Sequence, residues 1–165
     1  MEVELESPSA VPQLPDNSLE GYVIDAPHAA TQLMEEIARQ PWNGLFVACD
    51  YGKTWAEITE SCPEGTARAY HRHRQSNDLL RNPGEQDLTC HICWDWLVDC
   101  LRAHHFVDVQ VEAQESFLVR RASDYIAHVS TADAARFSAR KVSLLQLLHP
   151  SQMGQKFQVL HARRR

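Results

Sequence analysis

The chain has 165 residues, of which 44% are hydrophobic and 23% are charged, so it is long enough to bury the core of one ordinary domain. Its six glycines and eight prolines exclude a collagen-like or wholly disordered chain. The formal net charge of -6 argues against general binding to nucleic acid or to an anionic membrane surface.

The first residues predict an irregular lead-in over 1–18. The start, Met-Glu-Val-Glu-Leu-Glu, lacks the basic and apolar regions of a secretory signal. The longest apolar run, Leu45–Cys49, is far too short to span a membrane. Five cysteines are an odd number without framework spacing, which favours reduced thiols. We therefore expect a cytoplasmic protein without membrane or nucleic-acid partners.

Residues 25–50 predict a helix followed by a strand. Asp25-Ala26-Pro27 is typical of a helix start, and Pro41 would end the helix. One apolar stripe at helical spacing is formed by Ala30, Leu33, Met34 and Ile37. The continuous apolar run Gly44–Asp50 predicts a buried strand, because a helix followed by such a run is typical of an α/β sheet.

The rest of the chain continues this alternation around a long polar connection. Residues 62–93 form the connection, which has one weak strand candidate at Ala67–Tyr70 and a length typical of functional or lid-like segments. Helices are predicted over 54–61, 94–101, 114–130 and 133–148, the last with Phe137, Leu144, Leu145 and Leu148. Strands are predicted over 106–112 and 156–161. The order of elements indicates the α/β class.

Asp50 and Tyr51 directly follow the predicted strand 44–50, at the end of a strand where ligands bind in open α/β sheets. A carboxylate there could accept hydrogen bonds from a substrate amine, a guanidinium or a ribose. Asp50 could equally cap the next turn, with Gly52 adopting a positive φ. From the spacing alone, both interpretations stay open.

The polar connection carries clustered charges: Arg68, His71, Arg72, His73 and Arg74, then Glu85, Asp87 and His91. These groups could bind a phosphate or a substrate backbone, or they could neutralise one another on a solvated surface. Tyr70 is the one aromatic residue interleaved with them, so a stacking platform for nucleic acid is poorly supported.

Cys90-His91-Ile92-Cys93 is a CxxC motif, but a second pair at the spacing of a closed zinc site is missing. Further groups that make a metal site conceivable are Cys100, His104 and His105. Apolar packing around Trp94 and Trp96 is the simpler interpretation, so we predict no metal ligands and keep a small metal-binding protein as an alternative. The glycines, at 21, 44, 52, 65, 84 and 154, form no G-x-G turn that could cradle a nucleotide.

Several segments, taken in order, resemble one family. The first are Gly44-Leu-Phe-Val-Ala-Cys-Asp-Tyr-Gly52, Gly65-Thr66-x-Arg68-x-Tyr70-x-x-His73 and Pro83-Gly84-Glu85-Gln86-Asp87-Leu88-Thr89-x-His91. Downstream follow Gln114-x-x-Phe117-Leu118 and Leu147-x-x-Pro150-x-x-Met153-Gly154-x-x-Phe157-x-Val159-Leu160. From about residue 19 to 161, the chain resembles the carboxyl-terminal half of the MidA-like class I S-adenosylmethionine-dependent methyltransferases. These include a mitochondrial enzyme that modifies an arginine of a respiratory complex I subunit.

The resemblance implies a partial Rossmann-like sheet. In the family's strand order 3-2-1-4-5-7-6, residues 45–50, 107–112 and 156–161 would be strands five, six and seven, with strand seven antiparallel between the other two. The glycine-rich turn and the acidic residue that hold S-adenosylmethionine have no counterpart here and would precede residue 1. Residues 19–165 would then be the carboxyl-terminal half of a methyltransferase domain, with an insert over 62–93, and no cofactor-binding residue is assigned.

The resemblance also implies a substrate side of the cleft, formed by Asp50, Tyr51, His73, Glu85, Asp87 and His91. It leaves the chemical base unassigned and suggests a protein arginine as the methyl acceptor. Residues 45–48 would present an unpaired apolar edge, so we expect the chain to self-associate or to pair with a chain that supplies the amino-terminal half. A non-catalytic interaction module that keeps this edge for a partner stays open as an alternative.

Overall fold

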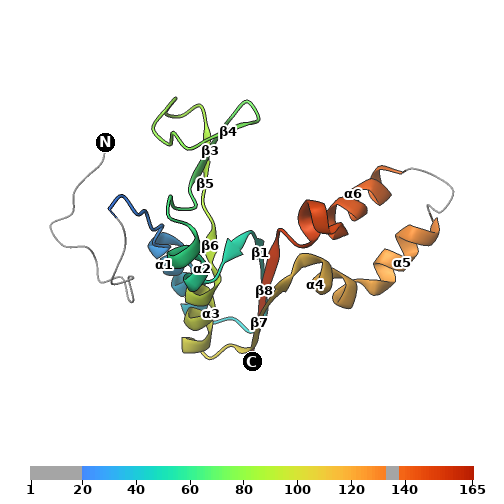
Figure 1. The fold of residues 1–165 in the computed structure, drawn as a ribbon. Helices are drawn as coiled ribbons and strands as arrows, with labels where there is room; N and C mark the ends of the chain where they lie inside the picture. The colour runs from blue at the N-terminus through green and yellow to red at the C-terminus, as the bar shows by residue number, and fades with distance from the viewer. Residues whose placement is uncertain (1–19, 133–137) are drawn as a thin grey trace.

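The computed structural model describes residues 20–132 and 138–165 (Figure 1). A three-stranded sheet lies at the centre, a β-rich arm extends from one side of it, and a group of helices extends from another. The predicted lead-in over 1–18 and the predicted helical position Phe137 lie outside the described residues.

The central sheet has the order β1 (Gly44–Asp50), β8 (Gln158–Arg164), β7 (Val107–Ala113). β8 runs antiparallel to both neighbours, as predicted for these three segments. β8 lies two to three residues further along the chain than predicted, because its pairing with β1 extends to Arg164 opposite Gly44. The basic residues at this end carry no apolar signal, so pairing rather than composition makes them a strand.

One face of the central sheet packs against two helices, α1 (His28–Arg39) and α3 (Trp94–Ala103). The buried core consists of Met34, Ala38, Trp94, Leu97, Cys100, Leu101, Phe106, Leu160 and Ala162. Removal of these apolar side chains from water holds the sheet and both helices together as one unit. The helical spacing predicts both helices correctly.

β1 forms the edge of the central sheet. Phe46 packs against the core, whereas Leu45 and Val47 on the other face are 58% and 42% exposed. The prediction of a strand over Gly44–Asp50 is confirmed, but the prediction that this strand is buried is wrong. Its continuous apolar run gives β1 two apolar faces, of which the described residues cover one.

The polar connection folds into the arm. Helix α2 (Trp55–Ser61) precedes it and begins with a capping box between Thr54 and Glu57. The arm is an antiparallel sheet in the order β4 (Arg74–Ser76), β3 (Arg68–His71), β5 (Asp87–Thr89). At its base, β2 (Gly52–Lys53) pairs in parallel with β6 (Ile92–Cys93). Of these strands, the sequence predicts β3. The strands β2, β4, β5 and β6 are too short and polar to show the alternation of apolar and polar residues that marks a strand.

The remaining helices are α4 (Gln114–Arg121), α5 (Ser123–Ala132) and α6 (Ala139–Leu148), followed by an irregular turn, η1 (Pro150–Gly154). The helical stretch predicted over 114–130 is two helices, because the backbone leaves the helical region at Ala122. Gln114 ties this group together, since its Nε2 donates to the Leu147 carbonyl at 2.9 Å. Val129 of α5 is buried, whereas α6 has no buried residue.

Candidate functional site

A hollow of about 480 Å³ opens at the carboxyl end of β1. It is lined by Tyr51, Gly52, Lys53, Glu57, Tyr70, His91, Lys156, Phe157 and Gln158. These residues come from the segment after β1, from α2, from β3, from the turn before β6 and from the start of β8. The hollow therefore lies where the central sheet, the arm and α2 meet.

The floor of the hollow depends on close contact between β2 and β6. A Cβ atom added to Gly52 would lie 2.5 Å from the Ile92 carbonyl oxygen and 2.5 Å from Trp94 Nε1, so only glycine fits. Gln158 Oε1 accepts hydrogen bonds from the Gly52 amide at 3.1 Å and from Trp94 Nε1 at 3.2 Å. One side chain thus fixes β2 and α3 against the start of β8.

Aromatic rings form one wall. Tyr51 contacts His91 and Phe157 edge-on, with ring centroids 5.4 and 5.5 Å apart. Such edge-to-face contacts stabilise a fixed arrangement of the rings. Tyr51, His91 and Phe157 all line the hollow, so this wall is largely aromatic.

His91 is the lining residue with an unsatisfied polar atom. Its Nδ1 is buried without a hydrogen-bond partner among the described residues, while its backbone N–H donates to Thr66 Oγ1 at 3.0 Å. Burial lowers the pKa of His91 below its ordinary value of 6.5, and Lys53 and Arg68 lower it further, whereas Asp25 and Asp50 raise it. The imidazole is therefore neutral at pH 7, and it can accept a hydrogen bond or a proton.

The charged groups of the hollow are Lys53, Glu57 and Lys156. The Glu57 carboxylate accepts from Thr54 N at 2.8 Å and from Thr54 Oγ1 at 2.9 Å, and these bonds lower its pKa. Glu57 is therefore an ionised group held in place by the start of α2, in a hollow that two lysines also line.

Two of the six predicted substrate-side residues, Tyr51 and His91, line this hollow. Asp50 is the last residue of β1, and its Oδ1 accepts the Tyr51 N–H at 2.8 Å. Asp50 thus bonds the amide that directly follows it, but Gly52 does not have the positive φ that the turn-capping interpretation expected, so that part of the interpretation is wrong. Asp50 borders the hollow without being one of its lining residues.

The other three predicted residues lie in the arm and do not line the hollow. His73 is in the β3–β4 turn with a φ of 63°. Glu85 is in the loop before β5, where its carbonyl oxygen lies 2.7 Å from His71 Nδ1. Asp87 is in β5, opposite Tyr70 of β3.

Sequence reasoning did not single out Lys53, Glu57, Lys156 and Gln158. Glu57 carries a usable signal, since Thr54 and Glu57 have the spacing of a capping box. The two lysines and Gln158 carry none, because a hydrogen bond between Gly52 and Gln158 joins segments that are far apart in the sequence, and no local pattern reveals it.

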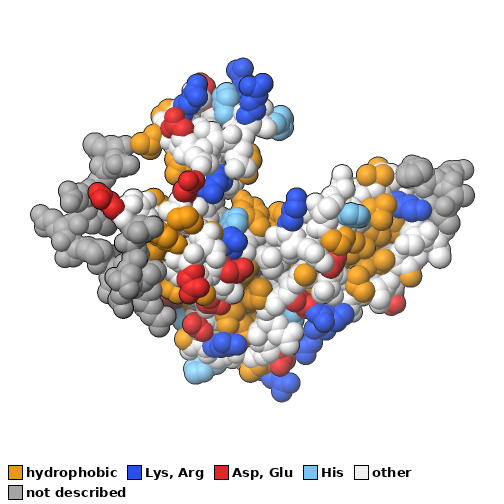
Figure 2. Space-filling view, in the orientation of Figure 1, with side chains coloured by type: hydrophobic (Ala, Val, Ile, Leu, Met, Phe, Trp, Pro, Cys, Tyr) orange, Lys and Arg blue, Asp and Glu red, His pale blue; other side chains and the backbone are white. Residues whose placement is uncertain are grey.

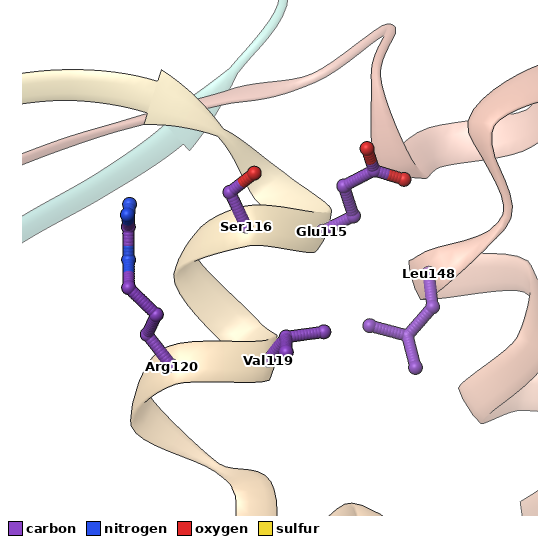
Figure 3. Close-up of a pocket in the computed structure, with 5 residues that line it drawn as sticks. All are labelled: Glu115, Ser116, Val119, Arg120 and Leu148. Carbon is purple, nitrogen blue, oxygen red and sulfur yellow. The ribbon is translucent and has the colours of Figure 1, made fainter.

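A second hollow, of about 340 Å³, lies between α4 and the end of α6 (Figure 3). Val119 and Leu148 point toward each other across it, and Arg120 lies on the other side of α4. Arg120 forms an ion pair with Glu112, whose other carboxylate oxygen lies 2.8 Å from His161 Nε2. None of the predicted site residues lines this hollow.

The CxxC cysteines do not form a metal site in the part of the chain that the structure describes. No group of three or more His, Cys, Asp or Glu side chains is placed to hold an ion there. Cys93 and Cys100 are buried, and burial raises the pKa of both thiols. Among the same residues, no helix is both long and apolar enough to cross a membrane.

Residues 3–113, more than half of the chain, match the family described as "Putative S-adenosyl-L-methionine-dependent methyltransferase". The chain belongs to this methyltransferase family. The match includes β1, the arm and β7, so most residues that line the hollow beside Tyr51 lie within it. A search of the curated proteins found no match.

Two solved structures of the COG1565 superfamily from Burkholderia thailandensis resemble the chain, each with a TM-score of 0.76 and 26% identity. One is an uncharacterized protein, and the other, described as a "likely methyl transferase", is bound to S-adenosyl-homocysteine. Each alignment covers 88% of this chain, but only 39% and 38% of the solved chains. The chain thus spans about two fifths of the length of these structures.

Proposed function

We propose that this chain forms the substrate side of an S-adenosylmethionine-dependent methyltransferase and that the hollow beside Tyr51 and His91 receives the methyl acceptor. The observation that carries the proposal is the position of the hollow at the carboxyl end of β1, where α/β sheets bind ligands. The family match and the relative bound to S-adenosyl-homocysteine support the reaction type. In this proposal, β1, β8 and β7 correspond to strands five, seven and six of the methyltransferase sheet.

The described residues do not fit S-adenosylmethionine itself. No glycine pair in the sequence makes a strand-to-helix turn, and the backbone groups that usually cradle the cofactor therefore have no counterpart. We propose that the donor pocket belongs to polypeptide other than these 165 residues. We derive no step through the cofactor, which supplies an electrophilic methyl group when bound.

A protein arginine is the acceptor that the resemblance suggests. Within the hollow, the rings of Tyr51 and Phe157 could hold a planar guanidinium, and the Glu57 carboxylate could pair with its charge. His91 lines the hollow, and its neutral imidazole could accept a hydrogen bond from the attacking nitrogen and so orient it. Lys53 and Lys156 oppose a cationic acceptor, so binding would require the guanidinium to lie on the Glu57 side.

A non-catalytic interaction module is the second candidate function. The exposed edge strand β1, with Leu45 and Val47 uncovered, favours it. The partner would be a chain that supplies the amino-terminal half of the sheet, or a second copy. The five free cysteines support a reducing, cytoplasmic location for either function.

Acceptor binding can be tested by NMR titration of the full chain with a short arginine-containing peptide and with its citrulline analogue. We expect the arginine peptide to shift the amide signals of Tyr51, His91 and Phe157, and the citrulline peptide to bind more weakly. His91→Asn should weaken binding about fivefold, the equivalent of one hydrogen bond of about 1 kcal/mol. The control His128→Asn, on the exposed side of α5, should leave binding unchanged. Shifts confined to other surfaces, or equal losses in both variants, would refute the acceptor site.

A further inference from the structure

The arm holds a polar hollow of its own, separate from the one beside Tyr51. It has a volume of about 390 Å³ and is lined by His71, Arg74, Gln75, Ser76, Arg81, Asn82 and Gln86. The lining thus contains two guanidinium groups, one imidazole, three amides and one hydroxyl, but no carboxylate. This set of side chains is rich in hydrogen-bond donors, which suits an oxyanion.

Hydrogen bonds hold the loop between β4 and β5 in a fixed shape around this hollow. Gln86 Nε2 donates to the Leu79 carbonyl at 2.8 Å, and the Asp78 Oδ1 atom accepts the Arg81 N–H at 3.1 Å. His71 Nδ1 lies 2.7 Å from the Glu85 carbonyl oxygen, which orients the imidazole of β3. The hollow is therefore shaped by its own loop before any ligand enters.

The two arginines of the hollow have no acidic partner. No ion pair of the described residues includes Arg74 or Arg81, and Asp78 bonds the backbone of Arg81 rather than its guanidinium. The insert over residues 62–93 contains four arginines and four acidic residues, so it carries no net charge as a whole, but within residues 68–82 the four arginines are accompanied by one acid, Asp78. Figure 2 shows arginine and histidine side chains gathered at the end of the arm. Arg74 and Arg81 are therefore not engaged in a direct ion pair among the described residues.

The edge of the arm indicates the kind of ligand. β4 lies at the outside of the sheet order β4-β3-β5, so one side of its backbone is unpaired. An extended peptide can add to such an edge through main-chain hydrogen bonds, and its side chains then reach groups on the same strand. A free anion would use only the guanidinium groups and would leave this edge without a role.

We propose that this hollow binds the carboxylate side chains of an acidic peptide segment from a partner protein, with Arg74 and Arg81 as its anchors. The planar guanidinium groups can each engage a carboxylate through two parallel hydrogen bonds. The site lies apart from the methyl-acceptor hollow, and neither Arg74 nor Arg81 lines that hollow. The proposal therefore stands whether or not the chain takes part in methyl transfer.

The test is calorimetric titration of the full chain with a hexaglutamate peptide, a hexaglutamine peptide and inorganic phosphate. We expect the glutamate peptide to bind, with an affinity that falls as salt is added. Arg74→Gln and Arg81→Gln should each weaken its binding about tenfold, the equivalent of one charge-assisted hydrogen bond. Arg74→Lys, which keeps the charge but not the fork, should recover part of the loss.

The matched control is Arg72→Gln, which removes the same charge from the adjacent turn but does not line the hollow. It should reduce binding less than twofold, about the effect of diffuse attraction alone. An equal loss in Arg72→Gln and Arg74→Gln would overturn the proposal, as would tight binding of the glutamine peptide. Binding of phosphate without binding of the glutamate peptide would also overturn it. Circular dichroism of each arginine variant serves as the control for folding. A separate variant, His91→Asn, should leave binding of the glutamate peptide unchanged.

Discussion

Gly52 shows how a single residue can determine the shape of the candidate site. Its missing side chain allows β2 to lie directly against β6 and the indole of Trp94. The Gln158 amide group then bonds both partners and fixes the start of β8. The hollow beside Tyr51 exists because these three segments approach more closely than any side chain at position 52 would permit.

Gly52→Ala should destabilise the protein by about 2 kcal/mol, because overpacking against backbone atoms cannot be relieved by a rotamer change. Urea unfolding followed by tryptophan fluorescence measures this loss. Gly84→Ala is the control, since its added Cβ meets nothing within 4 Å and its cost comes only from a φ of 81°. That cost should be about 1 kcal/mol. A smaller loss at position 52 than at position 84 would contradict the close-packing account.

His91 gives a prediction about pH. Burial lowers the folded-state pKa of His91 most, and Lys53 of β2 and Arg68 of β3 lower it further. Asp25 before α1 and Asp50 at the end of β1 raise it in part. The unfolded chain therefore binds more protons at this position as the pH falls below 6.5. The stability that neutral His91 contributes is complete above pH 6.5 and is lost as the pH falls through the folded-state pKa.

The free energy of unfolding should consequently fall more steeply between about pH 7 and pH 5 in the wild type than in His91→Asn. Urea unfolding curves of both proteins across this range measure the difference. His161, whose pKa burial also lowers, is present in both and cancels from the comparison. Parallel curves, or a steeper curve for the variant, would show that His91 is not held neutral by its surroundings.

At the scale of elements, β1 has the feature that most affects the behaviour of the chain in solution. Its outer backbone edge is unpaired in the described structure, and Leu45 and Val47 expose apolar surface beside it. An edge of this kind templates pairing with another chain. The same strand also ends at the candidate hollow, so a partner strand would lie close to the site.

We predict that the wild-type chain self-associates at micromolar concentration and that Leu45→Lys reduces this association. The charge on an edge strand opposes edge-to-edge pairing. Size-exclusion chromatography with light scattering provides the measurement. The matched control is Leu33→Lys on α1, because Leu33 and Leu45 are both 58% exposed. A monomeric wild type would contradict the prediction, as would an equal effect of the two substitutions.

The sequence predicts the helices and strands whose apolar residues repeat at a regular spacing. It does not predict the short strands, whose formation depends only on pairing with a neighbouring strand. The helical stripe from Ala30 to Ile37 and the apolar run before Asp50 identify α1 and β1. The strands β4 and β6 have three and two residues, too few for a pattern to emerge. For the hollow, the sequence singles out Tyr51 by its place after β1 and His91 by its place in the charged insert, whereas Lys156 and Gln158 come from the far end of the chain and carry no such signal.

At the scale of the whole molecule, the described fold is a core with two attachments. The arm supplies Tyr70 to the candidate hollow and carries the arginine hollow, while α4, α5 and α6 form a separate group (Figure 1). The chain spans about two fifths of its solved relatives. We propose that the methyl donor is held by a part of the sheet that these residues do not supply.

The most direct test is calorimetric titration of S-adenosyl-homocysteine into the purified 165-residue chain, with the solved Burkholderia thailandensis relative that binds this ligand as a positive control. The account predicts heat of binding for the relative and none for this chain at millimolar ligand. One-to-one binding by this chain alone, with a micromolar Kd, would contradict it, because these residues would then hold a complete donor pocket.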